Sequence, residues 1–190
     1  MAERRRDYVV IGLSSLPGGG KDYIADLLVK DYGFYKVSPG DTVREILKKF
    51  GSNITREVQQ QIQDRLRKKY GDDYIMELCY KKITKSNKRK IVIPGIRRPG
   101  DVTFYREKFG DSFLNIFVYA SQKLRYRRLM SRRREDSPSS YAEFLRQDKR
   151  EMEIFNLDKT KRTSDVILSN NDNTHRKLRA DLEDILKCFD

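Results

Sequence analysis

The segment from residue 15 to 22, Ser-Leu-Pro-Gly-Gly-Gly-Lys-Asp, is the part of the sequence best suited to bind phosphate. Glycines allow the main chain to fold around phosphate oxygens, and a helix that begins at the lysine would direct its positive end at them. A lysine at this offset reaches the β and γ phosphates of a nucleotide. The alternative is an ordinary glycine-rich turn between a strand and a helix. We expect a nucleotide to be bound by Pro17, Gly18, Gly19, Gly20, Lys21, Asp22 and Tyr23.

Two positions depart from the usual pattern of such phosphate-binding loops. Ser15 stands where a glycine usually leads, and Asp22, followed by Tyr23, stands where a hydroxyl residue usually binds magnesium. A carboxylate this close to a triphosphate would repel it unless a cation lay between them. We therefore hypothesise that Asp22 binds Mg²⁺ directly or through water. Alternatively, Asp22 only favours the N-terminus of the helix.

The elements that would position this loop are a buried strand before it and a helix after it. The apolar run from Tyr8 to Leu13 has the length of a parallel strand buried on both faces. Apolar residues then recur at helical spacing from Lys21 until Gly33, where the helix should end. The sequence predicts further strands at 34–37, 91–93, 113–119 and 166–168, and helices at 42–50, 56–70, 73–83, 99–109, 122–134, 141–154 and 174–189. This alternation predicts an α/β fold with a five-stranded, mostly parallel sheet and helices on both faces.

The composition is that of one folded domain. A chain of 190 residues suits a single α/β domain, and 37% hydrophobic residues provide enough apolar material for one core. No apolar run approaches the roughly 20 residues of a membrane helix, so we expect a cytoplasmic protein without a membrane partner. Cys79 and Cys188 lack the spacing of metal ligands, and we expect both thiols to be reduced and buried.

The charge is strongly basic, and its distribution is uneven. Lys and Arg exceed Asp and Glu by 13, which favours polyanionic partners: nucleic acid, nucleotides, phosphorylated metabolites or acidic lipid. Net charge alone does not choose among these. Arginines crowd the segment 125–134, and lysines form a second cluster at 81–90. The lysine cluster is expected to be a solvated helix end and loop.

Three short segments together resemble P-loop nucleotide and nucleoside kinases. The first is 20–22, Gly-Lys-Asp. The second, 38–44, is similar to the Thr-Gly-Asp-x-x-Arg segment of adenylate kinases, in which the arginine grips the acceptor phosphate; Arg44 matches that arginine, whereas Pro39 replaces the threonine. The third, 94–97, resembles segments of archaeal adenylate kinase-related proteins and of deoxynucleoside monophosphate kinases, but Pro94 stands in place of the usual Walker B acid. Acceptor binding is therefore implied, and adenosine specificity is not.

Two later segments extend the resemblance to almost the whole chain. Residues 125–132 and 165–170 resemble the lid and the final strand of dephospho-CoA kinases, and all five segments occur in the family's order. The resemblance implies a three-layer P-loop NTPase fold in one domain, 1–190. Within this domain, the helices that cap the acceptor would lie at about 41–85, and a lid would lie at about 125–150.

The resemblance also implies roles for individual residues in phosphoryl transfer. Lys21 would hold the donor phosphates, and Arg44 with Arg97 or Arg98 would clamp the acceptor phosphate through their planar guanidinium groups. Arg128 and Arg132, four residues apart on one side of a helix, would close over the donor together with Arg134 and exclude water. The alternative for these lid arginines is a solvated basic face. The expected catalytic residues are Lys21, Asp41, Arg128 and Arg132.

Asp41 has two interpretations that do not exclude each other. It would orient an acceptor hydroxyl or bind magnesium through water, or it would serve as the N-cap of a helix starting at Thr42. His175, in a polar segment before the last helix, is expected to be a surface or capping residue without a catalytic role.

The function that these patterns favour is transfer of the γ-phosphate of ATP, with Mg²⁺, to a nucleotide-like acceptor. The acceptor would be a nucleoside or deoxynucleoside monophosphate or dephospho-CoA, and the sequence leaves donor preference and oligomeric state open. The alternatives are an RNA-associated P-loop ATPase or a polynucleotide 5′-kinase, for which a net charge of +13 is an asset. A nucleotide-binding protein with weak catalysis is a third possibility.

Overall fold

A computed structural model describes residues 8–49, 55–132, 137–172 and 174–189. Five strands form one sheet in the order β2-β3-β1-β4-β5, and every pairing between neighbours is parallel. The expected α/β fold is confirmed, and the sheet is parallel throughout the described residues. The strands are β1 (Val9–Ser14), β2 (Tyr35–Lys36), β3 (Lys90–Ile96), β4 (Phe113–Tyr119) and β5 (Val166–Ser169).

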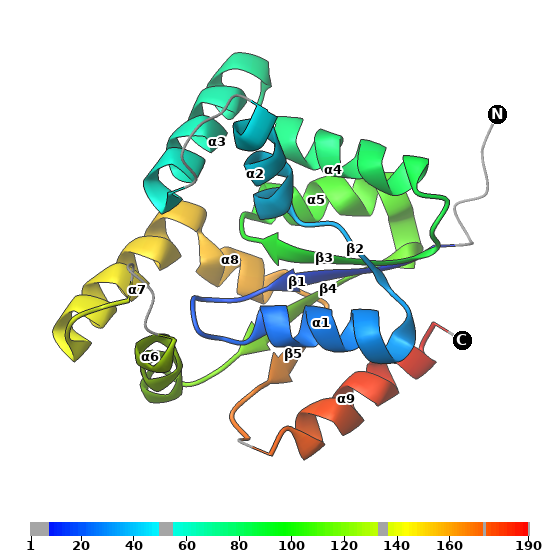
Figure 1. Cartoon of the computed structure of the whole chain (residues 1–190). Helices are drawn as coiled ribbons and strands as arrows, with labels where there is room; N and C mark the ends of the chain where they lie inside the picture. The colour runs from blue at the N-terminus through cyan, green and yellow to red at the C-terminus, as the bar shows by residue number, and fades with distance from the viewer. Residues whose placement is uncertain (1–7, 50–54, 133–136, 173, 190) are drawn as a thin grey trace.

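Helices cover both faces of the sheet and extend beyond one of its edges (Figure 1). The face with α2, α4 and α5 and the face with α1 and α9 each have their own hydrophobic core. The helices are α1 (Lys21–Tyr32), α2 (Pro39–Lys49), α3 (Arg56–Tyr70), α4 (Tyr74–Lys85), α5 (Pro99–Phe109), α6 (Gln122–Ser131), α7 (Tyr141–Phe155), α8 (Leu157–Arg162) and α9 (Arg176–Lys187); a 3₁₀ turn spans Gly110–Ser112.

The central strand β1 is apolar at nearly every position because its two faces meet different cores. Val10 belongs to the core under α2, α4 and α5, whereas Ile11 and Leu13 belong to the core under α1 and α9. All three side chains are fully buried. A strand with one exposed face alternates apolar and polar side chains, whereas a strand buried on both faces needs apolar side chains at nearly every position. This explains the continuous apolar run in the sequence.

The carboxyl ends of the strands meet at one edge, and the phosphate loop lies there. Ser14 of β1 pairs with Ile96 of β3, so the segment after β3 begins beside the loop after β1. In Figure 1 two helical arms extend beyond this edge: α3 on the side of α2, and α6 with α7 on the other side. Ligands of open parallel sheets bind at this edge, and the arms would border any ligand there.

Several boundaries differ from the sequence predictions for local reasons. Helix α2 begins at Pro39 rather than Thr42, because a proline is well suited to the first turn and Ser38 supplies the cap: its Oγ accepts from the Asp41 N–H at 3.3 Å. The second interpretation of Asp41, as N-cap, is therefore wrong. Helix α6 ends at Ser131 rather than at residue 134. The short helix α8, which the sequence pattern did not predict, follows Asn156, a residue with left-handed backbone angles.

Helix α4 lies within the range 41–85 expected for the acceptor cap and also contributes to the core. Its buried residues Ile75, Met76, Cys79 and Ile83 are part of the core, so α4 belongs to the body of the fold. Cys79 is buried as expected, but Cys188, which follows α9, is exposed; both thiols are free. Phe50 lies outside the described residues.

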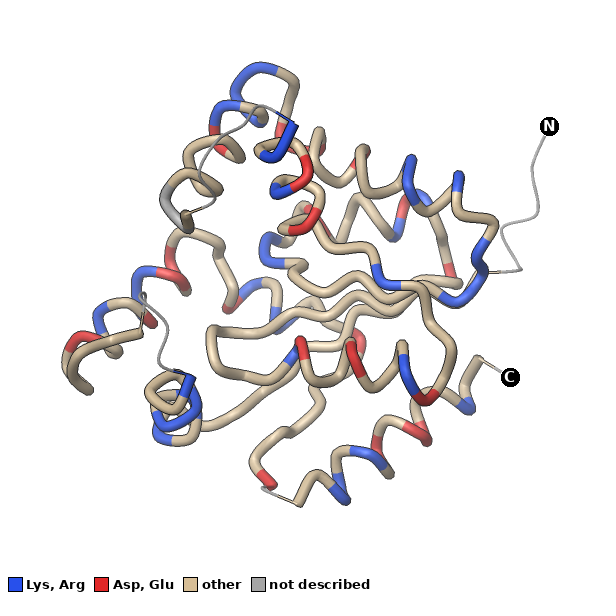
Figure 2. The backbone as a smooth tube through the Cα atoms, in the orientation of Figure 1, with Lys and Arg blue, Asp and Glu red and all other residues tan. Residues whose placement is uncertain are grey.

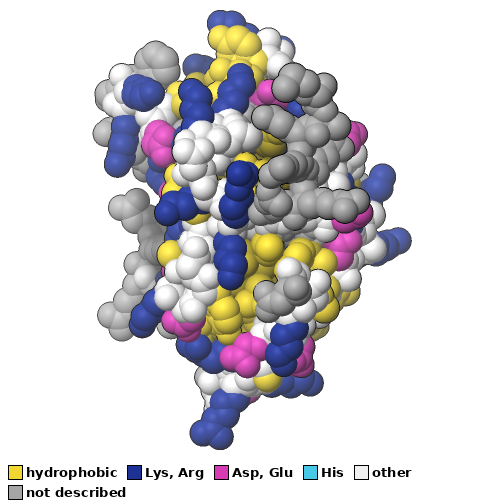
Figure 3. Space-filling view, turned by 90° about the vertical axis from the view of Figure 1, so that its right-hand side faces the viewer, with side chains coloured by type: hydrophobic (Ala, Val, Ile, Leu, Met, Phe, Trp, Pro, Cys, Tyr) yellow, Lys and Arg dark blue, Asp and Glu magenta, His cyan; other side chains and the backbone are white. Residues whose placement is uncertain are grey.

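Basic residues are spread over the surface and do not gather only at the loop. Figure 3 shows Lys and Arg scattered over the face that carries the chain ends, among a few hydrophobic side chains. In Figure 2 the basic segments predominate on α6, which contains no acidic residue, whereas basic and acidic segments alternate on α7. None of the helices in the described part of the chain is both long enough and apolar enough to cross a bilayer.

Candidate nucleotide-binding site

The loop between β1 and α1 adopts a conformation that requires glycine. Gly18 and Gly20 have φ angles of 79° and 101°, in the left-handed region, and the Gly19 N–H donates to the Leu16 carbonyl at 3.0 Å. A Cβ atom on Gly18 would lie 2.8 Å from the Arg125 carbonyl oxygen. The three consecutive glycines thus allow both this tight turn and its close approach to α6.

Asn170 at the end of β5 holds the back of this loop. Its Nδ2 donates to the Gly19 carbonyl at 2.8 Å, and its own N–H donates to the Tyr119 carbonyl at 2.7 Å. The Asn170 side chain is 1% exposed, and a Cβ on Gly20 would lie only 2.1 Å from its Nδ2. Asn170 therefore fixes the direction of the peptide group between Gly19 and Gly20.

This arrangement leaves a row of main-chain N–H groups without acceptors. Among the described residues, none accepts from the N–H groups of Gly18 and Gly20, and the first turn of α1 has the unpaired N–H groups of every helix start. The first helical bond is donated by Ile24 to Gly20. Free N–H groups and the positive end of α1 converge here, so the loop suits the phosphates of a nucleotide.

Lys21 and Asp22 pair with each other in this ligand-free structure. Lys21 Nζ lies 2.7 Å from Asp22 Oδ1, and the lysine is mostly buried whereas the aspartate is exposed. Burial would raise the pKa of Asp22, but the charge and hydrogen bond of Lys21 outweigh it and hold this pKa below its usual value, with smaller contributions from Arg132 and Lys36. The Asp22 carboxylate is therefore paired with the Lys21 ammonium group that would bind a phosphate.

Asp22 is the residue predicted to bind a metal ion beside the phosphate loop. Within the described ranges, no cluster of three or more His, Cys, Asp or Glu side chains is arranged to hold an ion. Mg²⁺ is commonly held by one or two carboxylates together with phosphate oxygens and water. A single carboxylate beside a phosphate loop fits that chemistry, with the nucleotide supplying the other ligands.

Tyr23 is directed away from the loop. Its ring stacks on His175 at the start of α9, with centroids 4.5 Å apart and planes inclined by 27°. Any contact of Tyr23 with phosphate would therefore involve its main chain. His175 has a left-handed φ of 55° at the N-cap position of α9 but makes no side-chain cap hydrogen bond.

Arg125 of α6 connects the loop to the arm formed by α7. Its guanidinium group donates to Asp148 of α7 through Nη1 at 2.5 Å and Nη2 at 2.7 Å. Nε donates to the Ala120 carbonyl at 3.1 Å, and Nη1 also donates to the Pro17 carbonyl at 3.2 Å. Arg125 and Asp148 are 3% and 5% exposed, so this is a buried ion pair with every arginine nitrogen bonded. It fixes α7 relative to the phosphate loop.

The other lid arginines take different positions. Arg128 Nη2 donates to the Asn170 carbonyl at 3.0 Å, and its Nη1 lies 3.5 Å from the Gly19 carbonyl, so Arg128 supports the loop from behind. Burial lowers the pKa of Arg128, and the charge of Arg132 lowers it further, which indicates that the two cations are close, as their spacing predicted. Arg132 is exposed directly after α6, and Arg134 lies outside the described residues.

Asp41 and Arg44 form an ion pair in the first two turns of α2. Arg44 Nη2 donates to Asp41 Oδ1, and Nη1 donates to Gln59 Oε1 of α3 at 3.3 Å. Both charged side chains are partly exposed. The structure thus brings these two predicted residues together, with the acceptor-clamp arginine engaged by protein groups.

Arg97 and Arg98 follow β3 and lie near the C-terminus of α7. Arg97 Nη1 donates to Glu151 Oε2 at 3.4 Å, and its guanidinium lies 4.7 Å from the Phe155 ring centre. Arg98 Nη1 is 3.9 Å from Asp72, and its N–H donates to Asp101 at 3.0 Å. Both arginines therefore lie at the carboxyl edge of the sheet, between the two arms.

Three residues near this edge were missed by the sequence analysis: Asn170, Asp148 and Arg67. Asn170 could have been suspected, because a polar residue directly after a buried strand lies at the edge where ligands bind. Asp148 stands among seven charged or polar neighbours of an exposed-looking helix, and no local signal marks it as buried. Arg67 likewise stands in a run of charged residues on α3.

Comparison with known proteins identifies the family. A family model described as "AAA domain" (AAA_18) matches residues 11–156. A UPF0200 protein of Methanothermobacter thermautotrophicus is 35% identical over 164 residues, which cover 85% of this chain and 81% of that protein.

Solved structures agree on the fold. A shikimate kinase from Acinetobacter baumannii in complex with shikimate has a TM-score of 0.59 at 16% identity and covers 96% of this chain and 95% of its own. A gluconokinase from Sinorhizobium meliloti has a TM-score of 0.53 at 15% identity, with coverages of 97% and 98%. These likenesses show a P-loop kinase-like fold, as the resemblance implied. The chain therefore belongs to the AAA_18 family and to the family of the UPF0200 proteins.

Proposed function

We propose that this protein is a Mg²⁺-dependent kinase that transfers the γ-phosphate of ATP to a nucleotide-like small molecule. The observation that carries the proposal is the loop of Gly18 to Lys21, in which free N–H groups, a helix N-terminus and one lysine converge. Phosphoryl transfer needs little covalent help from a protein, since positioning and charge neutralisation supply most of the acceleration. A P-loop with basic groups on two flanking arms is suited to both.

The donor nucleotide would extend from the loop along the start of α6. An open depression of about 360 Å³ is lined there by Ser121, Lys123, Leu124, Arg127 and Asn171. Asn171 follows Asn170, which contacts the loop, and Asn171 Oδ1 accepts from the Ser121 N–H at 2.8 Å. The depression therefore begins close to where the phosphates would lie and offers room for the nucleoside.

The transfer itself would form a bond between an acceptor oxygen and the γ-phosphorus while the bond from that phosphorus to the β-γ bridging oxygen breaks, releasing ADP. Lys21 would leave Asp22 and neutralise charge on the donor phosphates. If the acceptor oxygen belongs to a hydroxyl group, its proton would pass to Asp41; an ionised phosphate acceptor has no proton to lose. Asp41 would first have to leave Arg44, which becomes free to bind the acceptor.

Bound Mg²⁺ would neutralise phosphate charge, and Asp22 is the residue that would hold it directly or through water. Since Pro94 replaces the usual acid, Asp22 is the main predicted ligand, and Asp41 is the other carboxylate that would reach the ion through water. Replacement Asp22→Ser restores the hydroxyl residue that is usual at this position and should shift the Mg²⁺ concentration needed for half-maximal activity. Equal Mg²⁺ dependence of wild type and variant would remove Asp22 from the metal site.

The proposal is tested by following the label of γ-³²P-ATP in the presence of Mg²⁺. The acceptor panel contains nucleoside and deoxynucleoside monophosphates, dephospho-CoA and 5′-hydroxyl RNA. We expect label on one class of small molecule, and none when Lys21 is replaced by alanine. Label on RNA, with steep weakening by salt, would favour the polynucleotide kinase instead. Transfer to water alone would refute the kinase function.

A further inference from the structure

Arg67 of α3 is a buried arginine in which two of the three guanidinium nitrogens lack partners. The residue is 9% exposed, and its Nε and Nη1 atoms are buried with no hydrogen-bond acceptor among the residues that the structure describes. Buried polar groups in native proteins are almost always hydrogen-bonded, since an unpaired one costs free energy. The two buried nitrogens without acceptors therefore call for an explanation, and a bound ligand would supply one.

Arg98 shares this property and lies close to Arg67. Its Nε is likewise buried without an acceptor in the described part of the chain. Arg98 Nη1 lies 3.9 Å from Asp72, which directly follows Gly71, the C-cap of α3, and the Gly71 N–H donates to the Arg67 carbonyl. Burial lowers the pKa of Arg67, and the positive charge of Arg98 is the next largest cause. Like charges repel, and an anion between them would relieve that repulsion.

The neighbouring carboxylates do not fill this role. Asp101 Oδ2 accepts from the N–H groups of Arg97 and Arg98, and Asp64 accepts from Gln60 on the exposed side of α3. Asp72 is 86% exposed and only approaches Arg98 at 3.9 Å. These acids raise the pKa of Arg67 at a distance, but none of them hydrogen-bonds its buried nitrogens.

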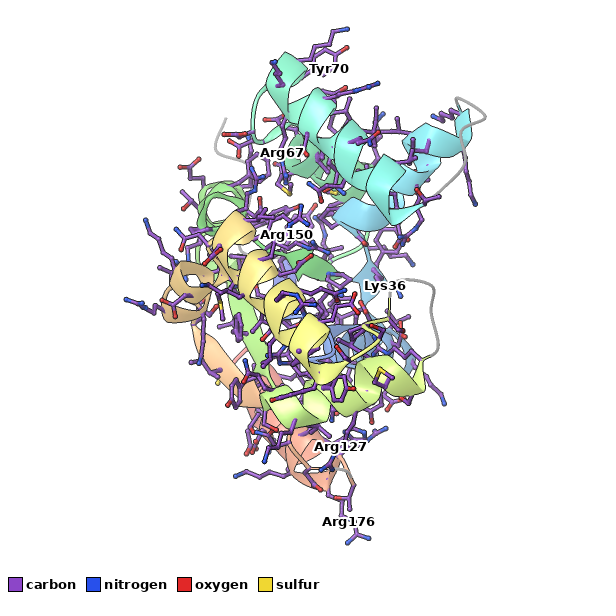
Figure 4. All side chains as sticks on the ribbon, turned by 90° about the vertical axis from the view of Figure 1, so that its left-hand side faces the viewer. Lys36, Arg67, Tyr70, Arg127, Arg150 and Arg176 are labelled. Carbon is purple, nitrogen blue, oxygen red and sulfur yellow. The ribbon has the colours of Figure 1, made fainter. Side chains whose placement is uncertain are left out.

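The position of the pair matches an acceptor site. Arg98 directly follows β3 at the edge that carries the phosphate loop, and Figure 4 shows Arg67 on the side of α3 that is turned toward α7. Arg67 is the one fully buried side chain among those described on α3, and the apolar residues Val58 and Ile62 of this helix pack against the core while only partly buried.

We propose that Arg67 and Arg98 form an oxyanion site that binds the acidic group of the acceptor, a phosphate monoester or a carboxylate. The identification of the ligand as the acceptor rests on the proposed kinase function, whereas the binding of an anion by these two arginines does not. An open depression of about 420 Å³ also touches Arg98, but it is lined by Asp72, Asp73 and Asp101 and is unsuited to an anion. The anion lies between the guanidinium groups, where it completes their hydrogen bonding.

The test measures binding of inorganic phosphate and, separately, of acetate by titration calorimetry in a Lys21→Ala background, which weakens the loop as a competing site. Adding Arg67→Gln should weaken binding of one of the two probes about 10- to 100-fold, the effect of losing charge-assisted hydrogen bonds. Loss for phosphate indicates a phosphate-bearing acceptor, and loss for acetate indicates a carboxylate. The exposed arginine of the same helix, Arg65, provides the matched control: Arg65→Gln should change neither affinity.

Two further measurements separate binding from structure and from the kinase function. Arg67→Met should keep or raise the melting temperature, because it removes an unpaired buried charge. Arg98→Gln should reproduce the loss of anion binding if the Arg67 variants do not fold. If the protein transfers the γ-phosphate of ATP to an acceptor, Arg67→Gln should raise KM for that acceptor and leave KM for ATP unchanged. Unchanged binding of both probes in the Arg67 and Arg98 variants, or a lower melting temperature of Arg67→Met with unchanged binding, would overturn the site, whether or not the protein is a kinase.

Discussion

Two buried arginines border the carboxyl edge of the sheet, and they differ in how their nitrogens are used. Arg125, beside the loop, has every guanidinium nitrogen bonded, to Asp148 and to two carbonyl groups. Arg67, on the opposite arm, leaves Nε and Nη1 without an acceptor in the described residues. The first arginine holds two elements together, whereas the second is available to a ligand. Burial alone therefore does not distinguish a structural cation from a binding one, but hydrogen-bond satisfaction does.

The largest expected effect on the free energy of unfolding comes from removing the carboxylate partner of Arg125, which leaves its guanidinium group short of acceptors like that of Arg67. Replacement Asp148→Ala leaves the buried guanidinium without its carboxylate and should lower the free energy of unfolding by about 3–5 kcal/mol. Urea denaturation followed by circular dichroism measures it. The control is Asp158→Ala, which breaks an exposed pair with Arg162 in α8 and should cost less than about 1 kcal/mol. The double variant Arg125→Met with Asp148→Leu should recover much of the free energy of unfolding lost in Asp148→Ala. Equal losses of this free energy in Asp148→Ala, Asp158→Ala and the double variant would contradict a structural role for the buried pair.

Removing the cation of the phosphate loop should act on turnover rather than on folding. Lys21→Ala should lower kcat by about 10² to 10³, the scale of losing one preorganised electrostatic donor. Its free energy of unfolding should change by less than about 1 kcal/mol, because its ion pair with the exposed Asp22 contributes little. Steady-state kinetics and urea denaturation of the same preparation measure both. A fall in kcat of less than about five-fold would indicate that the loop is not catalytic.

Replacement of a loop glycine should show that its conformation serves binding. Gly20→Ala and Gly33→Ala both put alanine at a positive φ, which should lower the free energy of unfolding by about 1–2 kcal/mol for Gly33→Ala and by more for Gly20→Ala. At Gly33 nothing lies within 4 Å of the added Cβ, whereas at Gly20 it would displace Asn170. Only Gly20→Ala should therefore weaken ATP binding, by about five-fold, the equivalent of one hydrogen bond. Equal ATP affinities in calorimetric titrations would refute the role of Asn170.

The smallest expected effect is the dependence of stability on the charge of Asp22. Because its pKa is lowered in the folded protein, its ionised form stabilises the fold above the ordinary aspartate pKa near 4, and this contribution is lost as pH falls through the folded value. Asp22→Asn should therefore be less stable than wild type at pH 7 by under about 1 kcal/mol and equal to it at pH 2. A difference that grows toward low pH would contradict the shift.

The contrast between the two arginines also explains what the sequence could predict. The loop, α1 and all five strands follow from local patterns: apolar runs, helical spacing and glycine positions. The contacts that give Arg125 and Arg67 their roles join residues far apart in the chain, such as Arg125 with Asp148 and Asn170 with Gly19. In the sequence Arg125 is one of six arginines in ten residues, and the packing of α7 against α6 decides which of them is buried.

The predicted acceptor clamp illustrates the same limit. Sequence resemblance pointed to Arg44 because of its motif, and the structure pairs it with Asp41 and Gln59. Arg67 has no motif, and its helix looks like a solvated charged face in the sequence. Its unpaired nitrogens become visible only once the fold has buried its side chain.

The most direct measurement of the central claim is a crystal structure of the protein with Mg²⁺ and a non-hydrolysable ATP analogue. The account predicts phosphate oxygens against the N–H groups of Gly18, Gly20 and the first turn of α1, with Lys21 Nζ moved from Asp22 to the phosphates. A nucleotide bound elsewhere, with the loop empty and Lys21 still on Asp22, would contradict it.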